Sequence, residues 1–432
     1  MEKLERENAL LRQRIAELET AAAAAEAPLP AALTETDVTS PFERVSSLTN
    51  AEIFRFGRQL VVPGFGLESQ IKLRSKSFLI VGAGGLGSPA ALYLGAGGVG
   101  RLGIVDHDTV DTNNLHRQVI HTEARCGVNK AVSAAIAIQA IYPDADVVPY
   151  AYTLDRTNAL QLIQQYDIVL DCTDNIATRY LLSDACVLAG KPIVSGSALR
   201  NDGQLTIYNY NNGPCFRCLH PVPPPASTVG RCVDSGVLGV VPGVIGMLQA
   251  LEAIKVAIDS PSLKEPSFLI FSAMSNPMFR TMRLRHKKKD CAICGDTPTM
   301  TELIDYVQFC DGSADDKTVD ETILKREERV DVHEYNKVVE EGVDHVLIDV
   351  RPAIQYGICR LPNSIHIPID ELDKKMTLVK DMMAEKNVDS EHGNDSQIAV
   401  RMMQKEGIDK PRDIIGGLLS WSTKVDASFP IY

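Results

Sequence analysis

The sequence predicts an α/β protein: a doubly wound, Rossmann-like domain with a mostly parallel sheet, followed by a smaller α/β domain. Between residues 77 and 197, short apolar runs alternate with helical patterns, as in a series of βαβ units. A glycine-rich loop, Gly82-Ala-Gly84-Gly85-Leu-Gly87, follows the first apolar run and opens a helical pattern. The chain has 432 residues, which is more than one ordinary domain, so two or three domains are expected.

Composition narrows the class of protein. The net charge of -12 argues against general binding to nucleic acid or to an anionic membrane surface. The sequence shows no signal peptide and no apolar run long enough to cross a bilayer. Four of the ten cysteines form C-x-x-C pairs, which favours metal binding in a reducing compartment over disulfides. We therefore expect a cytoplasmic protein without membrane contact and without direct nucleic-acid binding.

The domain organisation follows from changes of pattern along the chain. Leucines at every seventh position and a polar Asn8 predict a short two-stranded coiled-coil helix at the start, although a solitary helix fits equally well. A stretch with alanines and prolines follows, and a polar, acidic stretch separates the two domains. The expected segments are a helix at 1–22, a linker at 23–45, the main domain at 46–300, a second linker at 301–327 and the small domain at 328–432.

Local signals place the elements of the main domain. Thr49 and Glu52 form a capping-box pattern that opens a helix through Arg58 and Gln59. After residue 197 the run GQLTIYNY predicts an antiparallel strand. Further helices are predicted near 129–141, 155–166, 176–189 and 236–257, and strands at 146–150 and in the runs FLIVG, DIVLDC and KPIVSGS.

The glycine loop predicts a phosphate site, because backbone N–H groups at the start of a helix bind anions. Asp106 lies nineteen residues after Gly87, at the end of the next predicted strand, where a carboxylate takes ribose hydroxyls. These two features alone fit an NAD-dependent dehydrogenase equally well. The polar residues that follow favour a triphosphate and magnesium instead; they are Asp108, Asn114, Arg117, Gln118, Lys130 and Asp174.

The cysteines predict a structural zinc site and a separate reactive thiol. Four thiolates from two C-x-x-C pairs make a closed tetrahedral site with no open position; the pairs are Cys215 with Cys218 and Cys291 with Cys294. Cys232 lies between them in a proline- and glycine-rich loop, where a thiol could attack an activated acyl group. A packed loop cysteine is the alternative interpretation.

Residues 50–300 resemble the ubiquitin-activating-enzyme superfamily, in particular its bacterial MoeB and ThiF type. The resemblance is carried by GAGGLGSPAALYLGAGGVGRLGIVDHDTVDTNNLHRQ, by DCTDN and by both cysteine pairs. It implies an enzyme that uses ATP and magnesium to adenylate the C-terminal glycine of a ubiquitin-like protein ending in Gly-Gly. It also implies a homodimer, because Arg58 in RFGRQ resembles an arginine that reaches into the partner subunit's site.

The resemblance also implies roles for individual residues. Gly85 and Asp106 hold the adenosine, Asp174 holds magnesium, and Cys232 receives the acyl group. The implied catalytic set is Arg58, Arg117, Lys130, Asp174 and Cys232. The implied nucleotide-binding set is Gly82, Gly84, Gly85, Gly87, Asp106, Asn113, Asn114, Leu115, His116, Arg117, Gln118, Lys130, Asp174 and Asn175.

The last hundred residues resemble a rhodanese domain through LIDVRP, ICRLPNSIHIPID and IIGGLLSWSTKVDASFPIY. In that family a central strand ends in a catalytic cysteine followed by Arg, any residue, Gly, Asn and Asp. Here Ser390 stands at the cysteine position and no apolar strand precedes it, so rhodanese activity is doubtful. Loss of the middle strand should cost the fold, so we expect missing residues between about 384 and 393 rather than an inactive domain.

The two resemblances together imply the family of eukaryotic adenylyltransferases and sulfurtransferases that act on the ubiquitin-related modifier and on the small subunit of molybdopterin synthase. The expected reaction is adenylation followed by sulfur transfer, giving a thiocarboxylate for tRNA wobble-uridine thiolation and for molybdenum cofactor synthesis. A cysteine desulfurase or another persulfide donor supplies the sulfur. Two alternatives remain: an activating enzyme that passes a thioester onward for conjugation, and a non-catalytic scaffold that binds a ubiquitin-like protein.

Overall fold

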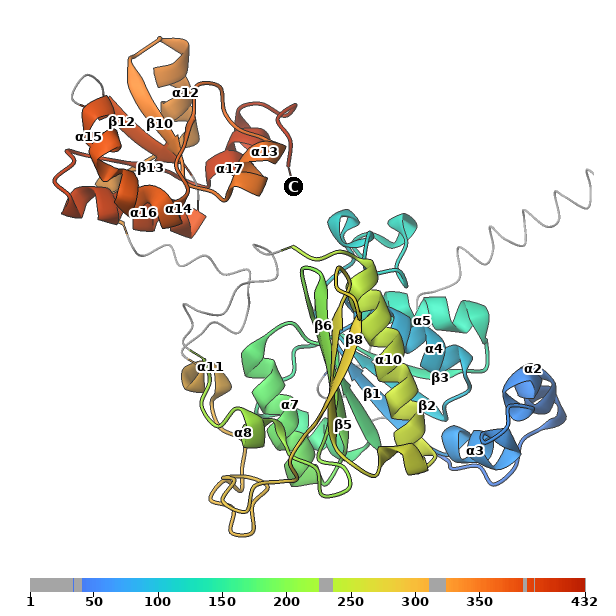
Figure 1. The fold of residues 1–432 in the computed structure, drawn as a ribbon. Helices are drawn as coiled ribbons and strands as arrows, with labels where there is room; N and C mark the ends of the chain where they lie inside the picture. The colour runs from blue at the N-terminus through green and yellow to red at the C-terminus, as the bar shows by residue number, and fades with distance from the viewer. Residues whose placement is uncertain are drawn as a thin grey trace, which may run out of the picture. The chain divides into compact units, whose positions relative to one another are not determined.

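The computed structural model describes residue 34 and residues 41–224, 236–310, 324–383, 387–391 and 393–431, with the backbone alone between 383 and 395. The chain forms two compact units, Met1–Asp316 and Lys317–Tyr432 (Figure 1). The expected coiled-coil helix at 1–22 and Cys232 lie outside the described residues.

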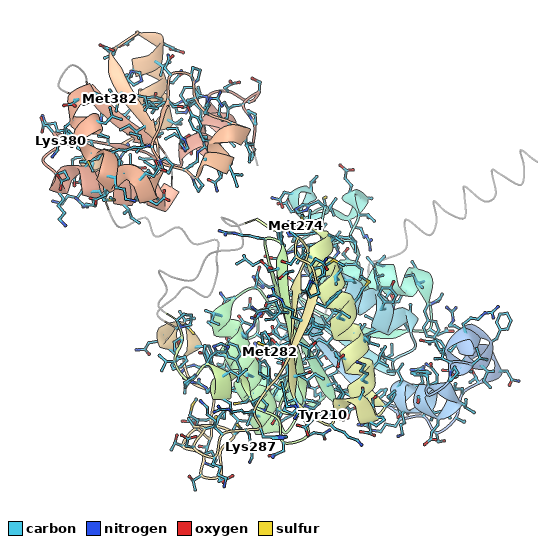
Figure 2. All side chains as sticks on the ribbon, viewed as in Figure 1. Tyr210, Met274, Met282, Lys287, Lys380 and Met382 are labelled. Carbon is cyan, nitrogen blue, oxygen red and sulfur yellow. The ribbon has the colours of Figure 1, made fainter. Side chains whose placement is uncertain are left out.

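An eight-stranded sheet in the order β3-β2-β1-β4-β5-β6-β7-β8 forms the first unit. The first five strands pair in parallel, and β6, β7 and β8 extend the sheet in antiparallel fashion. This confirms the predicted doubly wound sheet. The strands β7 and β8 were not predicted from the sequence. Every residue of β8 is exposed, including Met282 (Figure 2), so this edge strand lacks the usual alternation of buried and exposed side chains. The strands are β1 Ser77–Val81, β2 Arg101–Val105, β3 Asp146–Tyr150, β4 Ile168–Asp171, β5 Ile193–Leu199, β6 Asp202–Tyr208, β7 Ser267–Ser272 and β8 Phe279–Arg283.

Helices cover both faces of this sheet (Figure 1). On one face α4 and α10 bury Leu94 and Ile245 with the sheet, and on the other α6 and α7 bury Ile163 and Leu182. The helices are α2 Asn50–Leu60, α3 Gly66–Arg74, α4 Gly87–Ala96, α5 Lys130–Ile141, α6 Ala159–Gln164, α7 Ile176–Ala189, α8 Phe216–Leu219, α10 Val240–Ala257 and α11 Tyr306–Phe309.

Two helices start later than the sequence predicts. The helix expected at 155–166 begins at Ala159, because the Asp155 carboxylate accepts from the N–H of Thr157 and forms a turn there. The helix expected at 236–257 begins at Val240, since Gly236 has a φ of 67°, which a right-handed helix does not allow. The capping box of α2 is present as predicted, with Thr49 and Glu52 bonded reciprocally.

Among the described residues, α10 is the one helix long and apolar enough to span a membrane. Half of it is buried inside the unit, and it packs between α4 and the strands β5 and β6. A core helix of this kind passes the same length and composition test, so it is weak evidence for a membrane span.

Residues 301–310 fall in the expected second linker, and in the structure they pack against the first unit. The hydroxyl of Tyr306 donates to the buried Asp184 carboxylate at 2.8 Å. The Arg217 guanidinium also binds Asp184 and lies 4.4 Å from the centre of the Phe309 ring. The helix α11 is thereby joined to α7 and α8.

A five-stranded parallel sheet, in the order β11-β10-β12-β13-β9, forms the second unit. Two apolar clusters flank it, one around Ile348 and Met403 and the other around Leu347 and Trp421. Its strands are β9 Arg329–Val330, β10 His345–Asp349, β11 Ile365–His366, β12 Asn387–Glu391 and β13 Asp413–Ile414. Its helices are α12 Val332–Glu340, α13 Ala353–Ile358, α14 Ile369–Leu372, α15 Met376–Met383, α16 Gly393–Lys405 and α17 Gly417–Lys424.

The expectation that the middle strand is lost is wrong. The strand β12 lies in the centre of the sheet, where Asn387 to Glu391 pair with His345 to Asp349 of β10 and Ser390 pairs with Asp413 of β13. A ladder of backbone hydrogen bonds does not require apolar side chains, so the polar run NVDSE concealed this strand. The expectation of missing residues depended on the loss of this strand, and that ground is removed.

The segment after β12 is short. One residue, His392, separates the end of β12 from the start of α16 at Gly393. Of the six positions that match the rhodanese catalytic loop, 390–395, the first two lie in a strand and the last three lie in a helix. Ser390 lies within the strand, where the family pattern has a cysteine at the end of one.

Candidate nucleotide site and metal site

Three segments with predicted site residues leave the same edge of the first sheet. Val81 of β1 lies in register with Val105 of β2 and with Asp171 of β4. The glycine loop, the polar segment 106–118 and the loop 172–175 follow these three strands directly. Because parallel neighbours end side by side, residues about 90 positions apart in the chain meet at this edge.

The glycine loop needs its glycines for close backbone contacts. Gly82 has a φ of 96°, and a Cβ there would lie 2.7 Å from the carbonyl oxygen of Cys172. A Cβ on Gly87 would lie 1.9 Å from the carbonyl oxygen of Gly82, which no rearrangement of side chains relieves. The helix α4 begins at Gly87, so its N-terminal end, which carries the positive end of the helix dipole, lies at the loop and could hold a phosphate.

Asp106 holds the backbone of this edge together. Its carboxylate accepts from the N–H of Ala83 at 2.8 Å and from the N–H of Asp108 at 2.9 Å. Burial raises the pKa of Asp106, although Lys130 and these two hydrogen bonds act in the opposite direction. The carboxylate oxygens keep further acceptor capacity that could take ribose hydroxyls.

Cationic side chains lie beside the loop. The Arg117 guanidinium binds the Asn114 side-chain oxygen at 2.5 Å, the Asn113 carbonyl at 3.2 Å and the His116 ring at 2.8 Å. Burial and the Arg117 charge lower the pKa of His116.

Lys130, the buried first residue of α5, forms an ion pair with Asp108 at 2.9 Å. Leu115 is partly buried in this segment.

Gln118 tests whether these residues fit a nucleotide. Its side chain is 4% exposed, and its Oε1 atom has no hydrogen-bond partner among the described residues. A Cβ built on Gly84 would lie 3.7 Å from its Nε2 atom, so the amide faces the glycine loop. A buried amide oxygen without a partner is typical of a site that a ligand or a water fills, and an adenine nucleotide on this loop would supply polar atoms.

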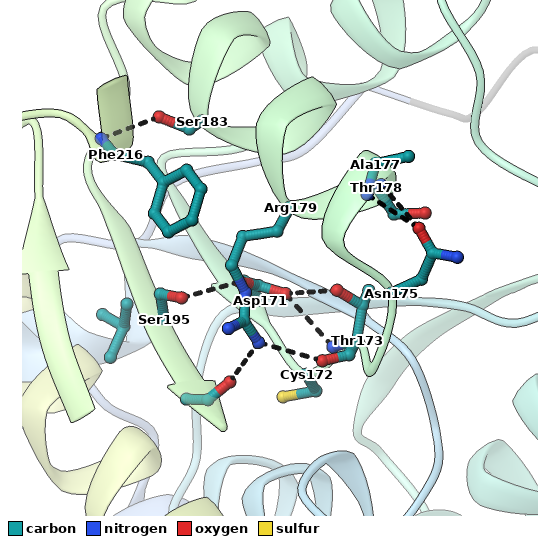
Figure 3. Close-up of polar contacts among 12 residues, drawn as sticks. Asp171, Cys172, Thr173, Asn175, Ala177, Thr178, Arg179, Ser183, Ser195 and Phe216 are labelled. Carbon is teal, nitrogen blue, oxygen red and sulfur yellow. Dashed lines mark hydrogen bonds and ion pairs between the residues drawn. The ribbon is translucent and has the colours of Figure 1, made fainter. Parts of the chain in front are cut away.

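The loop that carries Asp174 is fixed by residues that the sequence analysis missed (Figure 3). The buried Asp171 accepts from Thr173 Oγ1 at 2.7 Å and from Ser195 Oγ at 2.7 Å. Arg179 donates to Asp171 at 3.0 Å and to the carbonyls of Thr173 and Gly196 at 3.1 and 2.9 Å. No local signal marks Arg179, because these partners come from two different strands and a loop.

Asp174 itself is exposed at this edge, as a ligand for an incoming ion requires. Asn175 has a structural role: its side-chain oxygen accepts from the N–H groups of Ala177 and Thr178 and caps α7. The carboxylate of Asp174 could hold magnesium, which prefers oxygen ligands.

Arg58 does not join these residues. It is exposed on α2, and the next residue, Gln59, donates to the carbonyl of Gly97 at 3.1 Å. Gly97 follows α4 and precedes β2, so α2 lies at the opposite end of the strands from the glycine loop. Within one chain, Arg58 is therefore remote from the nucleotide site.

The four cysteines of the two pairs meet in one cluster. Their sulfur atoms all lie within 4.8 Å of one another, with 3.8 Å between Cys215 and Cys218, 3.6 Å between Cys215 and Cys291, and 3.3 Å between Cys218 and Cys294. A tetrahedral ion with Zn–S bonds of about 2.3 Å needs sulfurs about 3.8 Å apart, so the cluster fits zinc. Hydrogen bonds from the Cys215 and Cys294 thiols, and from the N–H of Lys288, lower the pKa of Cys218.

A cavity of about 200 Å³ opens beside the Asp174 loop. Ile176 and Arg179 of α7 form one wall, and β5 and β6 contribute the polar side chains of Ser195, Ser197, Gln204 and Thr206. A larger cavity of about 410 Å³ lies in the second unit, around Cys359 and Arg360.

Comparisons with known proteins agree with this architecture. The ThiF family matches residues 56–293, and the rhodanese-like domain matches residues 331–424. The chain is 45% identical to an adenylyltransferase and sulfurtransferase MOCS3 of Danio rerio over 99% of this chain and 97% of that protein. Proteins of the same name from Xenopus laevis and Aedes aegypti are each 47% identical, over 94% and 90% of this chain and 94% and 91% of theirs. The chain therefore belongs to the family of adenylyltransferases and sulfurtransferases that join a ThiF domain to a rhodanese-like domain.

Proposed function

We propose that this enzyme adenylates the C-terminal glycine of a ubiquitin-like sulfur carrier and then promotes sulfur transfer to that carbonyl carbon. ATP supplies the AMP that activates the carboxylate, and pyrophosphate leaves. Gly84 and the N-terminal end of α4 bind the phosphates, with Asn114, Arg117 and Gln118 beside them. Gly85 and Asp106 hold the adenosine. Lys130 offsets the charge that develops on the leaving pyrophosphate.

Magnesium binds at Asp174 in this proposal. The exposed carboxylate lies next to the glycine loop, since Gly82 contacts the carbonyl of Cys172. Arg179 and Asp171 keep the loop in place from below, without using the Asp174 carboxylate. The metal adds Lewis-acid charge stabilisation to the phosphoryl group when it is bound.

The carrier's C-terminal tail fits the cavity between α7 and β5–β6. Ile176 and Arg179 follow Asp174 by two and five residues, so a chain end in this cavity stops near the nucleotide. The hydroxyls and amide of Ser195, Ser197 and Gln204 could bond an extended backbone. The small volume favours glycines, as in a Gly-Gly terminus.

The body of the carrier would rest on the adjoining sheet face. Ser195, Thr206, Phe268 and Met282 lie opposite one another on consecutive strands and share a face. The neighbouring residue Gly196 approaches Gln249 of α10, so this row points away from α10. Met282 is 50% exposed (Figure 2), which suits an apolar protein partner.

The enzyme acts as a homodimer in which Arg58 serves the site of the partner subunit. The position of Arg58, remote from its own glycine loop, supports this arrangement. The large apolar side chains Ile53, Phe54, Val61 and Val62 on and beside α2 are exposed, with Phe54 at 92%. A second copy would cover them.

Sulfur transfer follows adenylation. The Cys232 thiolate attacks the acyl carbon, the C–O bond to AMP breaks, and a thioester forms. A persulfide of a cysteine desulfurase or a similar donor then displaces Cys232, and an external thiol reduces the acyl disulfide to the thiocarboxylate. The products would serve tRNA thiolation and molybdenum cofactor synthesis, in the cytoplasm.

The observation that carries the proposal is the convergence of the glycine loop, the cationic segment and Asp174 at one sheet edge, beside a cavity for a chain end. Pyrophosphate exchange tests it, with a carrier ending in Gly-Gly and a control carrier without its last glycine. Asp174→Ala should abolish exchange and leave the melting temperature unchanged, because the side chain is exposed. The control variant Asp144→Ala, which alters an exposed carboxylate between α5 and β3, should retain pyrophosphate exchange. Normal exchange by Asp174→Ala would refute the magnesium assignment.

A further inference from the structure

His121 joins three segments of the nucleotide site without belonging to the residues expected to touch ATP. Its side chain is 5% exposed. Its Nε2 atom lies 2.9 Å from the carbonyl oxygen of Ala83, and its Nδ1 atom lies 2.8 Å from Oγ of Ser133, which is fully buried. Both ring nitrogens therefore have a buried partner.

The partners determine the tautomer of the ring. A carbonyl oxygen only accepts hydrogen bonds, so Nε2 carries the proton and donates it to Ala83. Nδ1 then accepts from the hydroxyl of Ser133. Burial, and the charges of Lys130 and Arg125, lower the pKa of His121 to about 4, so the ring is neutral near pH 7.

Each partner belongs to a different phosphate-binding segment. Ala83 lies in the glycine loop, His121 lies three residues after the polar segment 106–118 that holds Arg117, and Ser133 lies one turn after Lys130 on α5. Arg125 reinforces the junction, because its guanidinium binds the carbonyls of Ile120 and Ser133 at 2.9 and 2.5 Å.

Ala83 is held through both of its backbone polar groups. Its N–H donates to Asp106 at 2.8 Å, and its carbonyl accepts from His121. This carbonyl belongs to the peptide group that carries the N–H of Gly84. The two bonds thus fix the direction in which that N–H points, and a phosphate is recognised by such N–H directions.

We propose that His121 is a positioning residue for ATP, which holds the glycine loop, the cationic segment and α5 in the arrangement that the phosphates require. The proposal rests on the proposed function only in placing the phosphates between Gly84 and Lys130. The side chain acts through Ala83 and Ser133, and it does not contact the nucleotide.

Two substitutions of His121 distinguish the effect of its hydrogen bond to Ala83 from the effect of its ring volume. His121→Phe keeps an aromatic ring and removes the donor, whereas His121→Gln keeps an N–H that can reach the Ala83 carbonyl. Titration of the full chain with ATP and magnesium by calorimetry gives the dissociation constant and the fraction of binding-competent protein separately. We expect His121→Phe to weaken ATP binding about tenfold or more and His121→Gln to restore it to within about threefold of the wild type.

Further variants test whether the loss of ATP affinity comes from the contact between His121 and Ser133. Ser133→Ala should weaken ATP binding less than His121→Phe, and it should add little in the double variant, because the two residues act together. Ser183→Ala is the matched control: it also removes a buried helix hydroxyl, which bonds the N–H of Phe216, away from the phosphate segments. Its ATP affinity should equal that of the wild type.

Each outcome decides the proposal. Equal losses in His121→Phe and His121→Gln, or a loss in Ser183→Ala, would mean general destabilisation and would overturn it. Lys130→Met tests the placement of the phosphates on its own. If Lys130→Met weakens ATP binding and His121→Phe does not, only the role of His121 is refuted; if neither does, the proposed phosphate site is refuted as well.

Discussion

At the scale of single residues, the proposed reaction has two stages, adenylation and replacement of AMP, which use different residues. Apart from Arg58, the proposed adenylation residues lie at one edge of the first sheet and before position 180, whereas the proposed nucleophile Cys232 belongs to a later segment. A thiol is not needed to form an acyl adenylate, since the carboxylate attacks the α-phosphorus of ATP directly. In the proposed reaction, the thiol of Cys232 acts in the step in which AMP is replaced.

Cys232→Ala should therefore retain pyrophosphate exchange and fail to form the thioester or the thiocarboxylate. The intact mass of the carrier after incubation with ATP and a persulfide donor distinguishes the products. Cys359→Ala, which alters the buried cysteine of the second unit, serves as the control and should behave as the wild type. Loss of exchange in Cys232→Ala, as severe as in Asp174→Ala, would mean that the cysteine is structural.

Sequence reasoning found residues whose local pattern indicates their chemistry and missed residues defined by tertiary contacts. Gly82 and Asp106 were predicted because the loop–helix–strand spacing is local. His121 and Arg179 were missed, since His121 bonds Ala83 and Ser133 and Arg179 bonds Asp171 and Gly196, and these partners meet only in the folded sheet. Their roles depend on direction and distance, which a spacing does not encode.

At the scale of elements, the four-cysteine cluster joins α8 to the segment after β8. Cys215 and Cys218 flank the start of α8, and Cys291 and Cys294 follow the end of β8. Arg217, between the first two ligands, is bonded to Asp184 of α7. Loss of the metal would therefore loosen α8, the β8 end and their contact with α7.

We expect the purified protein to hold about one zinc per chain. Cys218→Ser should lower both the zinc content and the melting temperature, because three thiolates bind the ion less tightly than four. Cys186→Ala, which alters a buried cysteine outside the cluster, should keep the zinc. Metal analysis that finds no zinc in well-folded protein would contradict the assignment.

The strands also show which elements an apolar sequence pattern can predict. The strands β1 and β4 were predicted because both of their faces are buried and their sequences are largely apolar, and β5 was predicted from the apolar, buried residues at its start. The polar β12 and the exposed β8 were missed, since pairing with neighbours, rather than side-chain burial, defines them. An apolar pattern detects a strand only where the core requires one.

At the scale of the whole molecule, the second unit keeps a complete parallel sheet without a cysteine at the catalytic position. The full chain should therefore exchange pyrophosphate but transfer no sulfur from thiosulfate to cyanide. Ser390→Cys should not restore this transfer, because residue 390 lies within β12 and only His392 separates that strand from α16. Thiosulfate sulfurtransferase activity in the unaltered chain would refute this prediction.

The proposed homodimer predicts that two inactive variants complement each other. Arg58→Ala and Asp174→Ala should each lack exchange alone. In a mixed dimer, one site combines an intact Asp174 with an intact Arg58 from the other chain, so mixing after exchange of subunits should restore up to about a quarter of the wild-type activity. No recovery in demonstrably mixed dimers would mean that Arg58 does not act across the interface.

The cysteine cluster also has a topological consequence. Cys215 and Cys291 are 76 residues apart, so one ion bonded to both closes a ring that contains α10, β7, β8 and Cys232. For a covalent cross-link, a ring of this size lowers the entropy of the unfolded chain by an amount equivalent to roughly 4 to 5 kcal/mol at 25 °C. The proposed nucleophile would thus be encoded inside a ring that a bound zinc closes, and the supply of zinc would then influence how readily a newly made chain encloses this thiol.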